Sequence, residues 1–234
     1  MASGNTDRYC ICMSKAPQNL NDRAALLNEA RWEPNAIIRV KFVSGDDALK
    51  QRVREVAERW TAPGMADLTL NFIEEGNAEI RIDFAPGKGS WSYLGTVCRD
   101  ISADEPTMNY GWLTADSTDD ELQSVVLHEF GHALGLIHEH QNPEGGIKWN
   151  EPAVIAELSG PPNDWDEATI RRNVLDHYAA DDVTSTPVDP ASIMMYPIPA
   201  AWTLDGFSTG LNGDLSETDV ELIREVYGGG QATA

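Results

Sequence analysis

Residues 128–138 read HEFGHALGLIH, which places three imidazoles, one carboxylate and two glycines at short, regular spacings. His128 and His132 are four residues apart, so on a helix both rings share one face and can bind one metal ion. His138 would lie about 9 Å beyond His132 on a continued helix, whereas a Zn–N bond is about 2 Å long. The chain must therefore turn back, and Gly135 suits a left-handed helix end.

Glu129 follows the first histidine and is better placed to hold a water molecule than to bind the metal. Three neutral ligands with a held water describe an open, catalytic zinc site rather than a closed, structural one. A chance pair of surface histidines is the alternative. It is weak because the chain has only 5 histidines in 234 residues, four of them between positions 128 and 140. The sequence thus predicts one catalytic Zn²⁺ held by His128, His132 and His138, with Glu129 as general base and then general acid.

The same stretch resembles the HExxHxxGxxH motif of the metzincin zinc endopeptidases. A second segment, Ser192-Ile193-Met194-Met195-Tyr196, resembles the Met-turn of that clan, and its Ser-Ile-Met-x-Tyr form is most similar to the astacin family. Glu139, directly after the third histidine, and the segment from Arg31 to Val40 also look like that family. Three features depart from it: Met195 stands where histidine is common, residues 140–143 follow the family pattern only in part, and the family's disulfide cysteines are missing.

The resemblance implies an α+β, zincin-like (metzincin) fold. Such a fold has a twisted mixed β-sheet with backing helices above an active-site cleft, and an irregular C-terminal subdomain that ends in a helix. Residues 1–30 would be an N-terminal extension or pro-segment. Residues 31–138 would form the N-terminal subdomain that ends in the zinc-binding helix, and residues 139–234 the C-terminal subdomain with the Met-turn.

The resemblance also implies roles for three residues outside the zinc motif. Met194 would be the structural Met-turn residue, a hydrophobic floor under the histidines. Tyr196 would be catalytic: it binds the resting zinc and then swings out to donate a hydrogen bond to the developing oxyanion. Taken alone, a tyrosine before Pro197 is more often a packing aromatic. Glu139 would contact a buried region close to the mature N-terminus.

Hydrophobic patterning predicts the secondary structure around these motifs. Residues 37–43 and 68–73 read as strands around a helix from Asp46 to Trp60, which predicts that the two strands pair in parallel. Residues 107–113 are expected to form an exposed edge strand that binds extended peptide, or else an ordinary strand without a ligand. The remaining predicted elements are a strand at 79–84 and helices at 22–30, 119–136, 166–178 and 216–227.

The composition limits the partners of the chain. With 17 basic and 38 acidic residues the net charge is −21, which argues against binding nucleic acid or an anionic membrane through bulk electrostatics. The acidic surface could attract cationic substrates or Ca²⁺, but no calcium-loop spacing supports Ca²⁺, and a merely solvated surface is the simpler reading. We expect a monomer that acts on a protein or peptide substrate. The resemblance implies secretion or export, but the first residues lack the apolar run of a signal peptide. The sequence leaves three alternatives open: a signal that has been removed, another export route, or a protein that stays inside the cell.

The three cysteines, Cys10, Cys12 and Cys98, are too few for a disulfide-stapled scaffold. A thiolate from the N-terminal segment could occupy the fourth zinc position and keep the enzyme latent. Unstructured surface thiols, or a pairing with Cys98, are the favoured alternative. Surface positions are expected for His140 and His177.

Two other functions fit the same residues. The zinc and Glu129 could hydrolyse a non-protein amide such as a peptidoglycan cross-link. Alternatively, the chain could be a binding or toxin-like module with vestigial turnover, which the presence of Glu129 disfavours.

Overall fold

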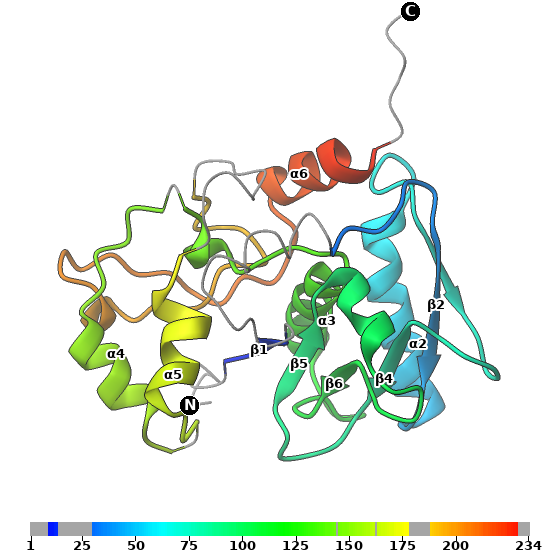
Figure 1. Ribbon diagram of the computed structural model, residues 1–234, viewed down its shortest axis with the longest axis horizontal. Helices are drawn as coiled ribbons and strands as arrows, with labels where there is room; N and C mark the ends of the chain where they lie inside the picture. The colour runs from blue at the N-terminus through cyan, green and yellow to red at the C-terminus, as the bar shows by residue number, and fades with distance from the viewer. Residues whose placement is uncertain (1–8, 14–29, 144, 162, 178–187, 229–234) are drawn as a thin grey trace, which may run out of the picture.

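The computed structural model describes residues 9–13, 30–143, 145–161, 163–177 and 188–228. Its centre is a mixed six-stranded sheet of order β1-β5-β6-β4-β2-β3, in which β5 is antiparallel to β6 and the other pairs are parallel. Helices α2 and α3 pack against this sheet (Figure 1). The strands are β1 Ile11–Met13, β2 Ile37–Phe42, β3 Thr69–Phe72, β4 Ile80–Asp83, β5 Ser90–Tyr93 and β6 Met108–Tyr110.

The β2–α2–β3 unit forms because the sequence of α2 carries a helix cap and an apolar face. Helix α2 (Asp47–Ala57) begins after Asp46, whose side chain accepts a hydrogen bond from the Leu49 amide at 2.9 Å. Its buried face continues into a 3₁₀ turn at Glu58–Thr61 that buries Trp60 completely. The predicted helix and the predicted parallel pairing of β2 with β3 are both confirmed.

The prediction that residues 107–113 form the exposed edge strand is wrong. Strand β6 lies between β5 and β4, and all three of its residues are buried. The chain between β4 and β6 folds back as the antiparallel strand β5, which therefore takes the position outside β6. The short strand β1 then pairs with the outer edge of β5.

The second half of the chain is more helical than predicted. Helix α4 (Glu151–Leu158) was missed, although Pro152 stands in its first turn, where a missing N–H costs nothing. The predicted helix at 166–178 is instead α5 (Glu167–Ile170) followed by a π-helical turn at Arg171–Leu175. The predicted last helix is confirmed as α6 (Glu217–Tyr227), which starts with a capping box. Short 3₁₀ turns lie at Gly95–Asp100, Glu139–Gln141 and Ala200–Trp202.

Two large buried clusters organise the packing. The first lies between the sheet, α2, α3 (Asp119–Ala133) and α6, and it includes Met194. The second joins α4, α5 and the segment after the Met-turn, and it includes Tyr9 and Cys10 from the N-terminal segment. Strand β1 lies on the side of the sheet that faces α4 and α5 (Figure 1). The division at residue 138 stays a prediction.

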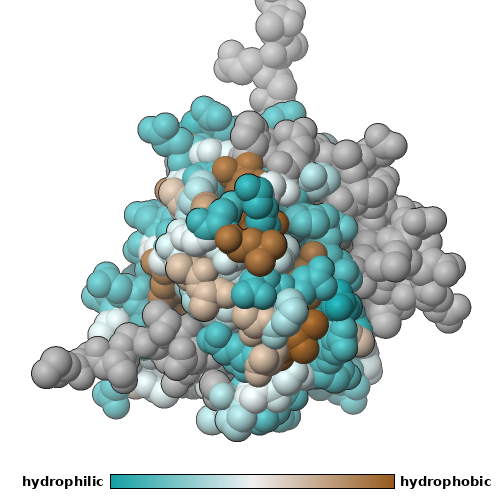
Figure 2. Space-filling model, turned by 90° about the vertical axis from the view of Figure 1, so that its left-hand side faces the viewer, coloured by the Kyte–Doolittle hydropathy of each residue, from teal (hydrophilic) through white to brown (hydrophobic). Residues whose placement is uncertain are grey.

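Figure 2 shows one face on which small hydrophobic patches stand among hydrophilic residues. None of the helices within the described residues is long and apolar enough to cross a membrane.

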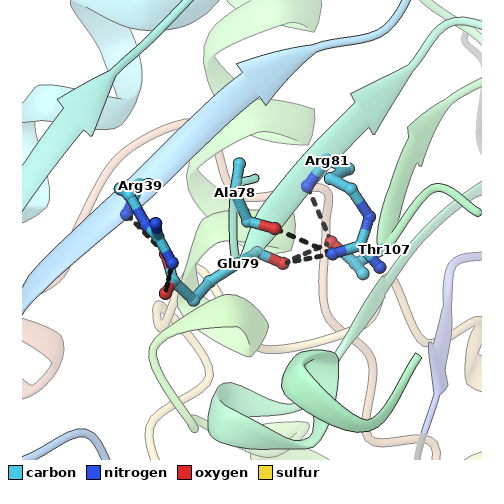
Figure 3. A network of polar contacts seen from close by, with 5 residues as sticks. All are labelled: Arg39, Ala78, Glu79, Arg81 and Thr107. Atoms are coloured by element: carbon cyan, nitrogen blue, oxygen red, sulfur yellow. Dashed lines mark hydrogen bonds and ion pairs between the residues drawn. The ribbon is translucent and has the colours of Figure 1, made fainter. Parts of the chain in front are cut away.

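A buried guanidinium fixes the loop that precedes β6. Arg81 of β4 is 6% exposed. Its side chain donates to the carbonyl oxygens of Ala78 (2.8 Å), Ser102 (3.0 Å) and Glu105 (2.6 Å). The Arg81 amide donates to the hydroxyl of Thr107 at 2.8 Å (Figure 3). One side chain thereby satisfies several backbone acceptors that a shorter residue would leave without partners.

We expect Arg81→Met to lower the free energy of unfolding by about 3 kcal/mol, because buried carbonyl groups lose their donors. Urea unfolding measures this change. Arg39→Met is the matched control from the same network: Arg39 is 47% exposed and pairs with Glu79 at 2.7 Å (Figure 3). Its loss should change the unfolding midpoint far less, because exposed ion pairs contribute little. Equal effects for the two variants would contradict the role given to Arg81.

Candidate active site

Helix α3 and the turn after it gather the three predicted zinc ligands. The helix is capped by Thr118, whose hydroxyl accepts from the Glu121 amide, and it ends at Ala133. Gly135 has φ +98°, the left-handed conformation expected from the sequence. The chain then turns back, so that the Nε2 atoms of His132 and His138 lie 3.1 Å apart.

Each of the three rings is oriented by an oxygen on its far side. A ring whose Nδ1–H donates to an oxygen presents its Nε2 lone pair to the centre of the cluster. The Nδ1 partners are Ile193 O for His128 (2.8 Å), Leu136 O for His132 (2.8 Å) and Gln141 Oε1 for His138 (3.3 Å). The protein thus holds all three imidazoles in the form that binds a metal.

The thiol of Cys10 completes the cluster. Its Sγ lies 2.8 Å from Nε2 of His128, 3.1 Å from Nε2 of His138 and 3.8 Å from Nε2 of His132. The four candidate ligand atoms lie within 4.8 Å of one another. Three imidazole nitrogens and one thiolate sulfur form a donor set that suits tetrahedral zinc.

The electrostatics of the cluster also suit a cation. Burial lowers the pKa of His128 to about 4, and it holds the pKa values of His132 and His138 well below their ordinary value. All three rings are therefore neutral at pH 7, as metal ligands must be.

Glu129 is the buried carboxylate of the site. It is 1% exposed, and burial raises its pKa well above the ordinary value. Its Oε2 has no hydrogen-bond partner among the described residues. A buried carboxylate without a partner is costly, and a nearby cation with a held water would relieve that cost. The residues present therefore fit a zinc ion.

Tyr196 lies beside the cluster, as the sequence predicts. Its hydroxyl donates a hydrogen bond to the backbone carbonyl of Cys10. Its ring centroid is 4.3 Å from that of His138, and the residue is 2% exposed. The side chain is thus both a packing aromatic and a hydrogen-bond donor at the site.

The Met-turn packs directly beneath α3. The Met195 amide donates to Ser192 O at 3.0 Å, which closes the turn. A Cβ on Gly131 would lie only 2.4 Å from the Met194 sulfur. Gly131 therefore lets Met194 approach the helix between the first two histidines, a need that the sequence analysis missed.

Asp219 is a second residue that the sequence analysis missed at this site. Its carboxylate accepts from the Ser192 hydroxyl (2.6 Å), the Ile193 amide (2.8 Å) and the Ser216 amide (2.9 Å). Since the Ile193 carbonyl orients His128, Asp219 supports that ring through the Met-turn. In the sequence, Asp219 indicates only the start of a helix, and nothing there links it to the histidines.

The surface position predicted for His140 is wrong, whereas that of His177 is confirmed. His140 is fully buried; its Nε2 is 2.9 Å from Asn173 O, and its ring centroid is 4.4 Å from that of Tyr196. The 3₁₀ turn at Glu139–Gln141 folds the ring inward, where an extended segment would have exposed it.

The expected pairing with Cys98 and the surface-thiol reading of Cys10 are also wrong. Both thiols are buried, and the Cys10 sulfur lies in the histidine cluster. Cys98 belongs to the first buried cluster, and burial raises its pKa to about 12. The side chain of Cys12 lies outside the part of the chain that the structure describes.

Glu139 is partly buried and accepts from the Asp189 amide at 3.0 Å, and burial raises its pKa to about 7. Its contact with a mature N-terminus stays a prediction.

Comparison with known proteins places this site in a family. The family model described as Astacin, a peptidase family, matches residues 26–147, slightly more than half of the chain. The solved structure of myroilysin aligns with a TM-score of 0.84 at 38% identity, covering 87% of this chain and 98% of that one. The chain belongs to the astacin family. This membership confirms the metzincin fold and places the chain among the zinc metalloendopeptidases, a class of hydrolases whose substrates are proteins or peptides.

Other relatives of this astacin-family chain are more distant. The zinc metalloproteinase dpy-31 of Teladorsagia circumcincta is 26% identical over 220 residues, 84% of this chain. Stromelysin-3 of Mus musculus is 29% identical over 129 residues, 48% of this chain. The chain matches only 31% and 26% of the lengths of those two proteins. High choriolytic enzyme 1, a hatching-enzyme zinc protease from Oryzias latipes, shares the fold at 16% identity with a TM-score of 0.56.

Proposed function

We propose that this chain is a zinc endopeptidase held in a latent state by its own N-terminal segment. The convergence of three Nε2 atoms and the Cys10 sulfur within 4.8 Å carries the proposal. His128, His132 and His138 would hold the zinc ion, and Cys10 would be the fourth ligand of the latent state. A bound zinc ion supplies a Lewis acid that makes water available for attack near neutral pH.

Glu129 and Tyr196 are placed to handle the protons and charge of the reaction. Glu129 would take the proton of the attacking water and deliver it to the departing amine. Tyr196 would donate a hydrogen bond to the oxyanion that develops on the substrate carbonyl. Its hydroxyl already donates to one peptide carbonyl at the site, that of Cys10, which supports this assignment. Met194 would act only as a packed floor under the histidines.

The latent state rests on two contacts of the N-terminal segment. Cys10 lies among the histidines, and β1 covers the outer edge of β5 through residues 11–13, which pair with Trp91–Tyr93. A peptide substrate would need the same free strand edge, because unpaired N–H and C=O groups bind an extended backbone. Release of the segment would therefore free the metal site and the substrate edge together.

We propose the following partners for the active enzyme. The substrate would be an extended protein or peptide chain laid along β5, and the enzyme would act as a monomer. The net charge of −21 disfavours nucleic acid and anionic membranes as partners. We propose that the protein acts after export, as the family suggests.

Casein digestion by the zinc-loaded Cys10→Ala protein, with and without phenanthroline, tests the assignment. Digestion should stop with the chelator and return when zinc is added, because the histidines alone supply no Lewis acid. Cleavage that persists in metal-free protein would contradict the proposal. Digestion of peptidoglycan but not casein would favour the amidase, and zinc binding with no hydrolysis of either would favour a binding module.

A further inference from the structure

The third zinc ligand is oriented in a different way from the other two. The Nδ1 atoms of His128 and His132 face backbone carbonyl oxygens. The Nδ1 atom of His138 faces a side-chain oxygen instead, Oε1 of Gln141 at 3.3 Å. Every residue has a backbone carbonyl, whereas few side chains end in an acceptor. Of the three ligands, His138 is therefore the one whose orientation depends on the type of residue at another position.

A 3₁₀ turn places Gln141 against His138. The backbone amide of Gln141 donates to His138 O at 3.0 Å, so the two residues lie one 3₁₀ turn apart. Side chains at positions i and i+3 of such a turn lie above one another. Both residues are buried, with exposures of 2% and 0%. Local geometry alone therefore brings the glutamine to the ring.

Contacts from a distant segment decide which end of the glutamine amide faces the ring. A glutamine side chain has two N–H donors on Nε2 and one acceptor oxygen. Nε2 of Gln141 donates to Arg172 O at 2.7 Å and to Asp176 O at 3.0 Å. A flipped amide would set Oε1 against these two carbonyl oxygens and remove their donor. The two carbonyls thus hold Oε1 toward His138.

The direction of this amide decides which ring nitrogen of His138 carries the proton. Oε1 of Gln141 can only accept, so Nδ1 of the neutral ring must donate. The lone pair is then on Nε2, which lies 3.1 Å from Nε2 of His132 and 3.1 Å from the sulfur of Cys10. The form of the ring that binds a metal therefore depends on carbonyl groups more than thirty residues away.

One of these carbonyls lies in the π-helical turn at Arg171–Leu175, and the other lies directly after it. The Asp176 amide closes the turn by donating to Arg171 O at 2.8 Å. The last carbonyls of a helix have no amide within it, so they can accept from side chains. Asn173 O is a second acceptor of this kind, 2.9 Å from Nε2 of His140. The chain after the third ligand is thus fastened to the π-helical turn at two neighbouring residues.

We propose that Gln141 is the positioning residue for His138, and that the π-helical turn, through this amide, sets how firmly the protein holds zinc. The inference rests on the proposed function and deepens its metal site. Replacing the hydrogen-bond partner of a metal-bound imidazole typically lowers the metal affinity by about 10- to 100-fold. An effect of that size is expected from a single amide in the second half of the chain.

Two substitutions in the full chain separate positioning from support of the fold. Gln141→Met removes the acceptor and both donors, whereas Gln141→Glu removes the donors but keeps an oxygen for His138. Both should lower the urea midpoint of the metal-free protein, because Arg172 O and Asp176 O lose their donor in each variant. In competition with a chelator, Gln141→Met should bind zinc about 10- to 100-fold more weakly than the wild type. Gln141→Glu should bind zinc about tenfold more tightly than Gln141→Met.

Gln51→Met is the matched control for the affinity measurement. Gln51 is exposed on α2, and its side-chain amide donates to Glu55 Oε1 at 2.8 Å. The substitution makes the same chemical change without a link to a histidine, so the zinc affinity should stay at the wild-type value. Wild-type affinity in Gln141→Met, or equal affinities in Gln141→Met and Gln141→Glu, would overturn the inference.

The ring proton provides a readout that loss of support alone would not change. NMR spectra of metal-free protein with isotope-labelled histidine rings distinguish a proton on Nδ1 from one on Nε2. The His138 proton should be on Nδ1 in the wild type and should leave it in Gln141→Met, while His128 and His132 keep theirs. A wild-type His138 with its proton on Nε2, or a Gln141→Met protein that keeps it on Nδ1, would overturn the inference. Either result would leave the peptidase function intact, since that function is tested separately by casein hydrolysis.

Discussion

Replacing Cys10 by alanine in the full chain should raise casein hydrolysis by about tenfold or more over the zinc-loaded wild-type protein. The substitution removes the sulfur that lies 2.8–3.8 Å from the three Nε2 atoms, while the histidines keep their supporting hydrogen bonds. Each 1.4 kcal/mol that the segment loses in affinity for the site raises the open population tenfold. Initial rates of hydrolysis of fluorescently labelled casein measure the change.

Cys98→Ala is the matched control for this experiment. It also removes one buried thiol, but from the first buried cluster rather than from the histidine site, so the protein should stay latent. The zinc content of all three proteins should be the same, because three imidazoles remain. Full activity in the wild-type protein and no gain in Cys10→Ala would contradict the latent state, with the peptidase function left standing.

Replacing Glu129 by glutamine in the Cys10→Ala protein should lower the turnover rate by about 10²- to 10⁴-fold and leave zinc bound. Glutamine keeps the size of the side chain but can neither accept the proton of the attacking water nor deliver it to the amine. Peptide hydrolysis and elemental analysis of the same sample measure the two effects. The loss should appear in kcat, since Glu129 handles protons rather than binding the substrate.

Glu121→Gln makes the same chemical change earlier on α3 and serves as the control. Glu121 lies in the first turn of the helix, away from the histidines, so its variant should hydrolyse peptide at the rate of the Cys10→Ala parent. A Glu129→Gln variant that cleaves at that same rate would show that another group moves the proton.

Helix α3 and its histidine ligands could be predicted because the residues that determine their geometry lie close together in the sequence. His128 and His132 share a face through helical periodicity alone, and the need to bring His138 back required a left-handed residue at Gly135. The N-caps of α2, α3 and α6 could also be predicted, because each cap binds an amide in the first turn of its helix. These caps are Asp46, Thr118 and Ser216.

The errors arose where placement depends on distant parts of the chain. Which strand lies outermost depends on how the segment between β4 and β6 folds back, and the strand sequences carry no such signal. His140 is buried because the 3₁₀ turn at Glu139–Gln141 brings it against Tyr196, more than fifty residues later. Cys10 lies 118 residues before His128, so no spacing rule could join them.

The carboxylate of Asp219 ties the far end of the chain to the metal ligands. It caps α6, holds the Met-turn and, through Ile193, steadies the imidazole of His128. If α6 frays, we therefore expect the affinity for zinc to fall while the sheet is still folded. Through this carboxylate, the position of the last helix and the orientation of the His128 ring depend on one another.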